Sequence, residues 1–254
     1  MVIKMVATEN ILSSEQYDTS EFDVNKIASR LFPGPDYMQW LRHFHNTLRP
    51  KSYIEIGIES GRALALAAAN TRAIGIDPDF KIIHSLIAST NLFRLTSDDF
   101  FANFDPMVLL GVDVIDFAFI DGLHTFDQAL KDFIYIEHYA GPKTVVIFHD
   151  IYPITKETST RERTTVFWTG DTWKVIPALR ASRPDLKIFT IPTFPSGLGV
   201  ITNLDPKSTI LVDNFEFILK ECFTWNFEAI DGAQNEILNV VPNDPVIVSE
   251  LIGF

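Results

Sequence analysis

Two acids and two histidines stand at the ends of two apolar runs of the sequence. Residues 114–120 are almost all apolar and lead into Asp121, with His124 shortly after, and residues 144–148 lead into His149 and Asp150. Such runs are typical of strands buried on both faces of a parallel sheet, and ligands of open α/β sheets bind at the carboxyl ends of these strands. We therefore expect Asp121 and Asp150 to share a site.

The chemistry to which these four residues are suited is activation of a hydroxyl group. An alcohol is a poor nucleophile until its proton leaves, so a metal or a general base must help. His124 or His149 could be that base, since imidazole titrates near neutral pH, or either could be a metal ligand or a structural residue. Consecutive strand residues point to opposite faces, so His149 and Asp150 need not face one cavity. The acids could also cap helices or bind loop backbone.

A second motif lies in residues 53–77. An apolar strand leads into Gly57 and Gly61, an alanine- and leucine-rich stretch predicts a helix from about Gly61, and a second strand ends on Asp77. The glycines let the backbone turn and approach a ligand, and a helix N-terminus would offer N–H groups to a carboxylate or phosphate. An acid closing the second strand can accept both hydroxyls of a ribose. The unit predicts a ribose-containing cofactor.

Alternating strands and helical stripes position these motifs. Residues 24–48 predict two helices broken around Pro33-Gly34-Pro35, and the spacing of Ile83, Leu86 and Ile87 predicts a helix within residues 80–90. Two further strands, residues 186–192 and 198–203, are joined by a connection too short for a parallel crossover, so they should pair antiparallel.

The organisation expected from these patterns has four parts. A polar arm (residues 1–20) precedes two N-terminal helices (21–49), an α/β core (50–204) and a C-terminal extension of mixed character (205–254). The arm could act as a lid. The aromatic N-terminal helices and the extension could form the interface of a homo-oligomer.

Composition excludes several classes of function. The 254 residues are 46% hydrophobic, which suits one compact α/β domain, and the formal charge of −12 argues against nucleic acid or an anionic membrane as a partner. No apolar run approaches the roughly 20 residues of a membrane span. Cys222 is the single cysteine, and no signal-peptide pattern is present, so we expect a cytoplasmic protein without disulfides.

Several motifs together resemble a known family. The segment Glu55-Ile56-Gly57-Ile58-Glu59-Ser60-Gly61 resembles the glycine motif of class I S-adenosylmethionine-dependent methyltransferases. The segments around Asp121-Gly122-Leu123-His124 and His149-Asp150 resemble methyltransferase family 24. The resemblance covers residues 50–204. It implies a Rossmann-like, doubly wound, mainly parallel seven-stranded sheet closed by an antiparallel C-terminal hairpin, and O-methylation of a small-molecule or sugar-containing acceptor.

The resemblance also implies roles for individual residues. Glu55, Gly57 and Gly61 would surround the methionine part of S-adenosylmethionine, Asp77 would bind its ribose, and Asp98 would approach its adenine. Asp98 could instead only favour the start of its own helix. Asp121 is expected to border the cofactor as well as the reacting atoms.

A magnesium ion is a further implication of the resemblance. In related O-methyltransferases, acids at the positions of Asp121 and Asp150 hold Mg²⁺, which binds the acceptor hydroxyl. Those relatives carry Asp-Asp or Asp-Asn at the second strand end, whereas this chain has Asp150-Ile151 and lacks the third oxygen ligand. The departure leaves both a metal and a histidine base open.

Two other classes of function share part of this pattern. An NAD-dependent oxidoreductase uses the same turn and acid, although the G-x-x-x-G spacing and the hairpin count against it. A non-catalytic cofactor-binding or assembly protein could keep the fold without turnover.

Overall fold

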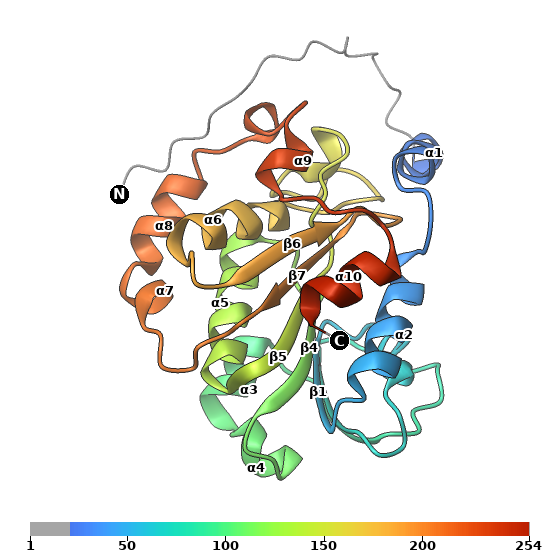
Figure 1. The fold of residues 1–254 in the computed structure, drawn as a ribbon, viewed down its shortest axis with the longest axis vertical. Coiled ribbons are helices and arrows are strands. Elements are labelled where there is room, and N and C mark those ends of the chain that lie inside the picture. The colour runs from blue at the N-terminus through green and yellow to red at the C-terminus, as the bar shows by residue number, and fades with distance from the viewer. Residues whose placement is uncertain (1–20, 254) are drawn as a thin grey trace.

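The computed structural model describes residues 21–253 as one three-layered α/β unit (Figure 1). Its sheet has the strand order β3-β2-β1-β4-β5-β7-β6, in which β7 alone is antiparallel to both of its neighbours. The strands are β1 Ser52–Ile56, β2 Arg72–Ile76, β3 Ser89–Phe93, β4 Ile115–Ile120, β5 Ala140–Phe148, β6 Lys187–Ile191 and β7 Leu198–Thr202. This is the predicted fold class, including the antiparallel hairpin of β6 and β7.

Helices lie on both faces of the sheet and in the C-terminal region. The α-helices are α1 Glu21–Leu31, α2 Tyr37–Leu48, α3 Ser97–Asn103, α4 Pro106–Leu110, α5 Phe126–His138, α6 Val175–Ser182, α7 Ile210–Asp213, α8 Phe215–Cys222, α9 Gln234–Ile237 and α10 Pro245–Ile252. The short 3₁₀ turns are η1 Leu64–Leu66, η2 Glu157–Ser159, η3 Thr172–Lys174 and η4 Phe227–Ala229. Within residues 21–253, no helix is both long and apolar enough to cross a membrane.

Consecutive strand residues point to opposite faces of the sheet, so their side chains form two hydrophobic cores, one on each face. Ile54, Ala118 and Val146 face the core that contains α5 and α6, whereas Tyr53 and Phe117 face the core that contains α2 and α10. Because each central strand is apolar on both sides, the sheet must be covered on both faces.

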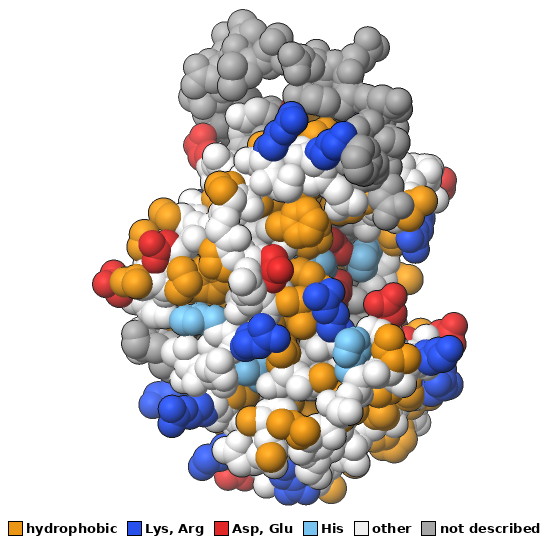
Figure 2. Space-filling view, turned by 90° about the vertical axis from the view of Figure 1, so that its right-hand side faces the viewer, with side chains coloured by type: hydrophobic (Ala, Val, Ile, Leu, Met, Phe, Trp, Pro, Cys, Tyr) orange, Lys and Arg blue, Asp and Glu red, His pale blue; other side chains and the backbone are white. Residues whose placement is uncertain are grey.

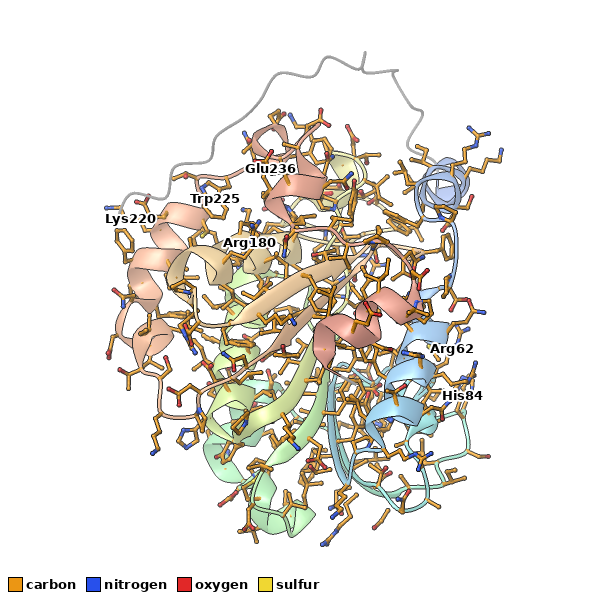
Figure 3. The ribbon with its side chains drawn as sticks, in the orientation of Figure 1. Arg62, His84, Arg180, Lys220, Trp225 and Glu236 are labelled. Atoms are coloured by element: carbon orange, nitrogen blue, oxygen red, sulfur yellow. The ribbon has the colours of Figure 1, made fainter. Side chains whose placement is uncertain are left out.

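The C-terminal extension packs against the sheet. Its helices α7 and α8 contribute Leu211 and Ile218 to the α5 core, and α10 contributes Val248 to the α2 core. The Arg180 guanidinium of α6 donates to the carbonyls of Glu236 and Ile237 at the end of α9 (Figure 3).

The helix predicted from Gly61 is absent. Only η1 forms between β1 and β2, because the connection of residues 62–71 is short. Residues 57–61 form the first turn, and ten helical residues after them would rise about 15 Å, roughly the length of a five-residue strand, and would leave none for the turn into β2. The sequence prediction was therefore wrong here.

The helix predicted within residues 80–90 is also absent. The backbone N–H groups of Lys81 and Ile83 donate instead to the carbonyls of Glu59 and Ser60 in the loop of residues 57–61, which we call the glycine loop. Ile83 is 70% exposed, so its spacing reflects no buried stripe. Hydrogen bonding to a distant loop has replaced local helix formation.

Candidate active site

The ends of β4 and β5 bring the predicted acids together. The strands pair in parallel with Ile120 opposite Phe148, so the residues that follow them leave the sheet side by side. The Asp121 N–H donates to the Ile56 carbonyl, and the His149 N–H donates to the Ile120 carbonyl. Three neighbouring strand ends are thereby joined by backbone hydrogen bonds.

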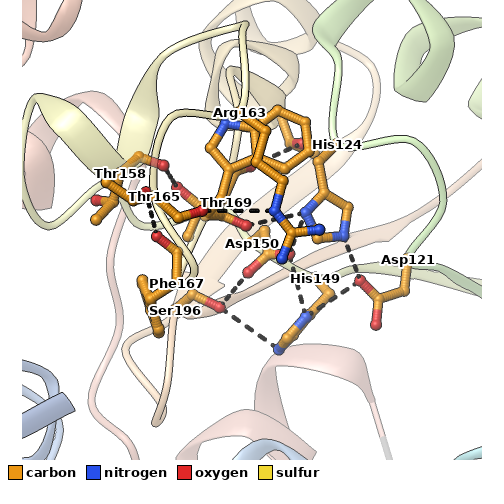
Figure 4. Close-up of polar contacts among 12 residues, drawn as sticks. Asp121, His124, His149, Asp150, Thr158, Arg163, Thr165, Phe167, Thr169 and Ser196 are labelled. Atoms are coloured by element: carbon orange, nitrogen blue, oxygen red, sulfur yellow. Dashed lines mark hydrogen bonds and ion pairs between the residues drawn. The ribbon is translucent and has the colours of Figure 1, made fainter. Parts of the chain in front are cut away.

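Asp121, His124, His149 and Asp150 form one compact group, which we call the strand-end cluster (Figure 4). Nδ1 of His149 lies 3.2 Å from Oδ1 of Asp121 and 3.5 Å from Oδ2 of Asp150. Nε2 of His124 lies 3.3 Å from Oδ1 of Asp121, and its Nδ1 lies 3.1 Å from Oδ2 of Asp150. Each acid is thus approached by both imidazoles.

His149 and Asp150 face the same site although they are consecutive. Strand β5 ends at Phe148, and Asp150 has φ +56°, in the left-handed region that few non-glycine residues adopt. This turn redirects the Asp150 carboxylate towards His149. His124 has a similar φ of +59°. Left-handed backbone at non-glycine residues concentrates at functional sites.

The charges of the cluster stabilise one another. Burial opposes ionisation of Asp121 and Asp150, but the neighbouring His149 and His124 more than offset it and lower the pKa of both acids. Burial likewise disfavours the charged imidazoles, yet the two acids raise the pKa of His124 to about 9 and that of His149 well above its usual value. All four shifts favour the ion-paired form of the cluster.

Surrounding loops hold the cluster in place. Ser196 is fully buried and its hydroxyl donates to Oδ1 of Asp150. The carbonyl of Trp168 lies 3.1 Å from Nδ1 of His124, and the two rings stack with centroids 5.4 Å apart. A Cβ on Gly170 would lie 1.8 Å from the His124 carbonyl oxygen, so only glycine fits there.

Three members of the cluster could hold a metal ion. One carboxylate oxygen from each of Asp121 and Asp150 and one ring nitrogen of His124 all lie within 4.8 Å of one another. Two oxygens and an imidazole nitrogen are a reasonable donor set for a divalent transition metal, but Mg²⁺ prefers oxygen alone.

The glycine loop lies directly beside this cluster. A Cβ on Gly57 would lie 1.9 Å from the carbonyl oxygen of Asp121, and a Cβ on Gly61 would lie 2.8 Å from Ile82. Both glycines have positive φ. Because no helix starts at Gly61, the expected helical N–H groups are not offered there, and close backbone approach is what the two glycines provide.

Glu55 and Asp77, the two acids of the motif in residues 53–77, have different partners. Oδ2 of Asp77 accepts the backbone N–H groups of Ile58 and Glu59, so Asp77 supports the glycine loop from the end of β2. Glu55 is 1% exposed and accepts a 2.6 Å hydrogen bond from the Tyr53 hydroxyl. Burial raises the pKa of Glu55 to about 8, a shift that the Tyr53 hydrogen bond only partly opposes.

Asp98 lies in the first turn of α3 and contacts α5. It accepts hydrogen bonds from Gln128 and Tyr135 and an ion pair from Lys131. These contacts give it a structural role, and its approach to an adenine stays a prediction.

Tyr37 is a site residue that the sequence analysis did not single out. It stands at the start of α2, and its ring centroid lies 4.6 Å from that of His149. Burial, partly opposed by His149, raises the pKa of its hydroxyl. The sequence feature that marks Tyr37 is its position just after the proline-containing break that precedes α2. Its contact with His149 could not be inferred from the sequence.

The loop between β5 and η3 borders the other side of the cluster. Trp168 stacks on His124, and Arg163 hydrogen-bonds within its own loop. Tyr152 packs edge to face against Phe32. On the face shown in Figure 2, Lys and Arg side chains are scattered among acidic and histidine side chains.

Part of the chain matches a known protein family. Residues 54–151 match the model of methyltransferase family 24, described as a methyltransferase domain. Among curated proteins, no sequence matches the chain significantly.

Solved structures also resemble the chain. The O-methyltransferase TomG from Streptomyces achromogenes, involved in tomaymycin synthesis and solved with SAM, has 13% identity and a TM-score of 0.54, covering 75% of this chain and 92% of its own. SAH-bound PaMTH1 from Podospora anserina has 14% identity and a TM-score of 0.49, covering 76% and 91%. An O-methyltransferase from Bacillus cereus with SAH has 14% identity and a TM-score of 0.47, covering 74% and 92%. With the strand order and the closing hairpin, the TomG match shows that the chain has the class I methyltransferase fold, and residues 54–151 are similar to the methyltransferase domain of the family model.

Proposed function

We propose that this chain is an S-adenosylmethionine-dependent methyltransferase that methylates a hydroxyl group of a small molecule. The observation that carries the proposal is the contact between the glycine loop and the strand-end cluster at Gly57 and Asp121. A cofactor held by the loop and an acceptor held by the cluster would therefore be neighbours.

The glycine loop and its supports fit the cofactor. Gly57 and Gly61 allow close backbone approach, Glu55 supplies a buried carboxyl group beneath the loop, and Asp77 supplies a carboxylate at the end of β2. S-adenosylmethionine supplies a methyl group already activated by its sulfonium sulfur, so the protein's main tasks are to align the acceptor oxygen and remove its proton. TomG, whose fold this chain shares, was solved with the same cofactor.

The strand-end cluster is suited to binding the acceptor hydroxyl and removing its proton. The side chains of Asp121 and His124 are each 25% exposed, whereas those of His149 and Asp150 are 10% and 7% exposed. An acceptor can therefore reach Asp121 and His124 first. A hydroxyl bound at Oδ1 of Asp121 would pass its proton to that carboxylate, and the positive charge of the two neighbouring imidazoles would favour the ionised hydroxyl. A divalent cation held by Asp121, His124 and Asp150 would add the same effect.

Aromatic side chains define where the acceptor lies. Tyr37 covers His149 from the N-terminal side, and Trp168 covers His124 from the loop after β5. Such rings exclude water and can pack against an aromatic or sugar ring. This arrangement supports a small acceptor with a ring-bound hydroxyl.

A methyl-transfer assay tests the proposal. The full chain is incubated with S-adenosylmethionine carrying a labelled methyl group and a panel of phenols and sugars. We expect transfer, with Asp121→Ala and Asp150→Ala reducing it at least about 100-fold. Asp113→Ala, an exposed acid before the start of β4, is the matched control.

Two results would overturn the proposal. Undiminished transfer by both cluster variants would remove the cluster from the reaction. Binding of S-adenosylhomocysteine without transfer to any acceptor of the panel would favour the non-catalytic alternative.

A further inference from the structure

We infer that Arg163 makes the site selective for an acceptor that carries a carboxylate as well as the hydroxyl, namely a hydroxylated aromatic carboxylic acid. The inference rests on the proposed function and specifies the substrate class of the same site. It is carried by the position of Arg163 beside the ring that covers His124, and by the donors that its guanidinium leaves free.

Trp168 connects Arg163 to the strand-end cluster. The Trp168 ring stacks on the His124 ring, with centroids 5.4 Å apart and planes 23° apart. The guanidinium carbon of Arg163 lies 5.9 Å from the centroid of the Trp168 ring. Arg163 is therefore separated from His124 by no more than these two distances together, and its side chain points from the loop towards the cluster (Figure 4).

The loop fixes the orientation of the Arg163 guanidinium. Its Nε donates to the Thr165 carbonyl at 3.4 Å, and its Nη2 donates to the Val166 carbonyl at 3.0 Å. The indole N–H of Trp168 donates to the Thr160 carbonyl, which closes the loop around these residues. Because both Arg163 bonds leave from the Nε edge, the edge formed by Nη1 and Nη2 keeps unused N–H groups. Such an edge can bind a carboxylate through two parallel hydrogen bonds.

Arg163 differs from the other cations of its loop in having no carboxylate partner. The Lys and Arg residues of the loop of residues 149–171 are Lys156, Arg161 and Arg163. Lys156 pairs with Glu228, and Arg161 pairs with Asp127. Within residues 21–253, Arg163 hydrogen-bonds to carbonyl groups and forms no ion pair. Its charge is therefore available to a ligand.

The charge of the chain makes this arginine decisive for an anionic acceptor. The formal net charge of −12 repels anions at long range. The strand-end cluster adds little net attraction, since its two acids face two imidazoles. An anion must therefore gain its binding energy from a nearby cation, and the exposed side chain of Arg163 can supply it.

An aromatic acid suits this arrangement better than a phosphate ester. A carboxylate is planar and presents two oxygens to one guanidinium edge, whereas phosphate is commonly held by backbone N–H groups at a helix N-terminus as well. The rings of Tyr37 and Trp168, which cover the cluster from two sides, suit a flat ring. A ring that carries both groups would place its hydroxyl at Asp121 and its carboxylate at Arg163.

Matched pairs of acids and amides test the inference on the full chain. The acceptors are 2-, 3- and 4-hydroxybenzoate and the corresponding hydroxybenzamides, which keep the ring and the hydroxyl but lose the charge. We expect kcat/KM for one of the acids to exceed that for its amide at least about tenfold. Arg163→Gln should lower kcat/KM for this acid about 10- to 100-fold, the order of a lost hydrogen bond to a charged group, and that for the amide less than about threefold.

Further variants separate recognition of the carboxylate from a structural role. Arg163→Lys keeps the charge but loses the planar fork, so it should recover only part of the preference for the acid. Lys207→Gln removes an exposed cation that follows β7, at the opposite edge of the sheet because β7 is antiparallel to β5, and should leave the preference unchanged. Melting curves and S-adenosylhomocysteine affinity should be the same for Arg163→Gln and the unaltered chain.

Calorimetry with the same acids and amides, in the presence of S-adenosylhomocysteine, measures acceptor binding without turnover. It therefore decides the inference even where no methyl group is transferred. No preference for any acid over its amide, or the same preference in Arg163→Gln as in the unaltered chain, would overturn the inference, and methyl transfer to the neutral acceptors would leave the proposed function standing. Binding of an acid that depends on Arg163, without methyl transfer to any acceptor, would support the inference and count against the proposed function alone.

Discussion

The hydroxyl of Ser196 donates a 2.5 Å hydrogen bond to Oδ1 of Asp150, from the loop that joins β6 and β7. The same loop accepts backbone N–H groups from Tyr37, through the Phe194 carbonyl, and from Tyr152, through the Ser196 carbonyl. The closing hairpin of the sheet therefore fixes the Asp150 carboxylate and connects the strand-end cluster to the start of α2.

Removing this hydroxyl should affect turnover more than cofactor binding. In Ser196→Ala, Oδ1 of Asp150 loses its buried donor and the carboxylate can rotate away from the imidazoles. We expect kcat to fall about tenfold with KM for S-adenosylmethionine unchanged, as for residues that orient site ligands. Steady-state kinetics measure both. Ser208→Ala, which removes a buried hydroxyl without a hydrogen-bond partner in the described part of the chain, is the control. An equal rise in KM for the cofactor would indicate a general structural role.

Tyr37 should contribute through its ring. Tyr37→Ala removes the aromatic cover of His149 and admits water to the cluster, so we expect kcat/KM for the acceptor to fall about tenfold or more, the order of one lost aromatic contact. Tyr37→Phe keeps the ring and should retain most activity. Kinetics with the acceptor varied distinguish these cases, and a loss of activity in Tyr37→Phe as large as in Tyr37→Ala would assign the role to the hydroxyl instead.

Glu55 should make stability depend on pH. Its folded pKa of about 8 lies above the ordinary 4.5, so protonation favours the folded state, and its contribution to stability is lost as pH rises from about 4.5 through 8. Between pH 5 and 7.5 the loss is about 3 kcal/mol. Glu55→Gln keeps an acceptor for the Tyr53 hydroxyl and cannot ionise. Denaturant unfolding at both pH values should show a smaller decline for the variant, and parallel declines would contradict this account.

The sequence predicted the ends of the central strands better than their connections. Asp121 and Asp150 could be placed at one sheet edge because two continuous apolar runs define β4 and β5, and the short connection before Leu198 defined the antiparallel hairpin. The helix at Gly61 failed because alanine and leucine favour a helix locally, while the length of the connection forbids one. Local propensity is a weak prior that tertiary geometry overrides.

The assembly of the site was only partly predictable. The alternation of a strand left open whether His149 and Asp150 face one cavity. Strand β5 ends at Phe148, and the left-handed φ of Asp150 brings both side chains to the same site. The contacts of Tyr37 and Ser196 with the cluster depend on how α2 and the β6–β7 loop pack. Such contacts between distant segments leave no periodic signal in the sequence.

His45 should weaken the fold at acid pH. It is 5% exposed between the rings of Tyr53 and Phe117, and neither ring nitrogen has a hydrogen-bond partner in the described residues. Burial lowers its pKa from 6.5 to about 4, so the unfolded state binds a proton more readily, and stability falls as pH drops below about 6.5.

The contribution of His45 can be measured with one substitution. Between pH 7 and 5 it should cost about 2 kcal/mol, and His45→Phe should remove that part of the decline. His138→Phe, at an exposed position, should not. Unfolding free energies at the two pH values measure the difference, and an unchanged slope in His45→Phe would show that other groups dominate the acid limb.

Titration with S-adenosylhomocysteine tests the central claim most directly, because it asks whether the glycine loop is a cofactor site for methyl transfer. Calorimetry on the full chain should give saturable binding with one site, strongly weakened in Asp77→Ala and retained in Asp113→Ala. NADH should give no comparable heat. Tight NADH binding without any heat from S-adenosylmethionine or S-adenosylhomocysteine would contradict the account.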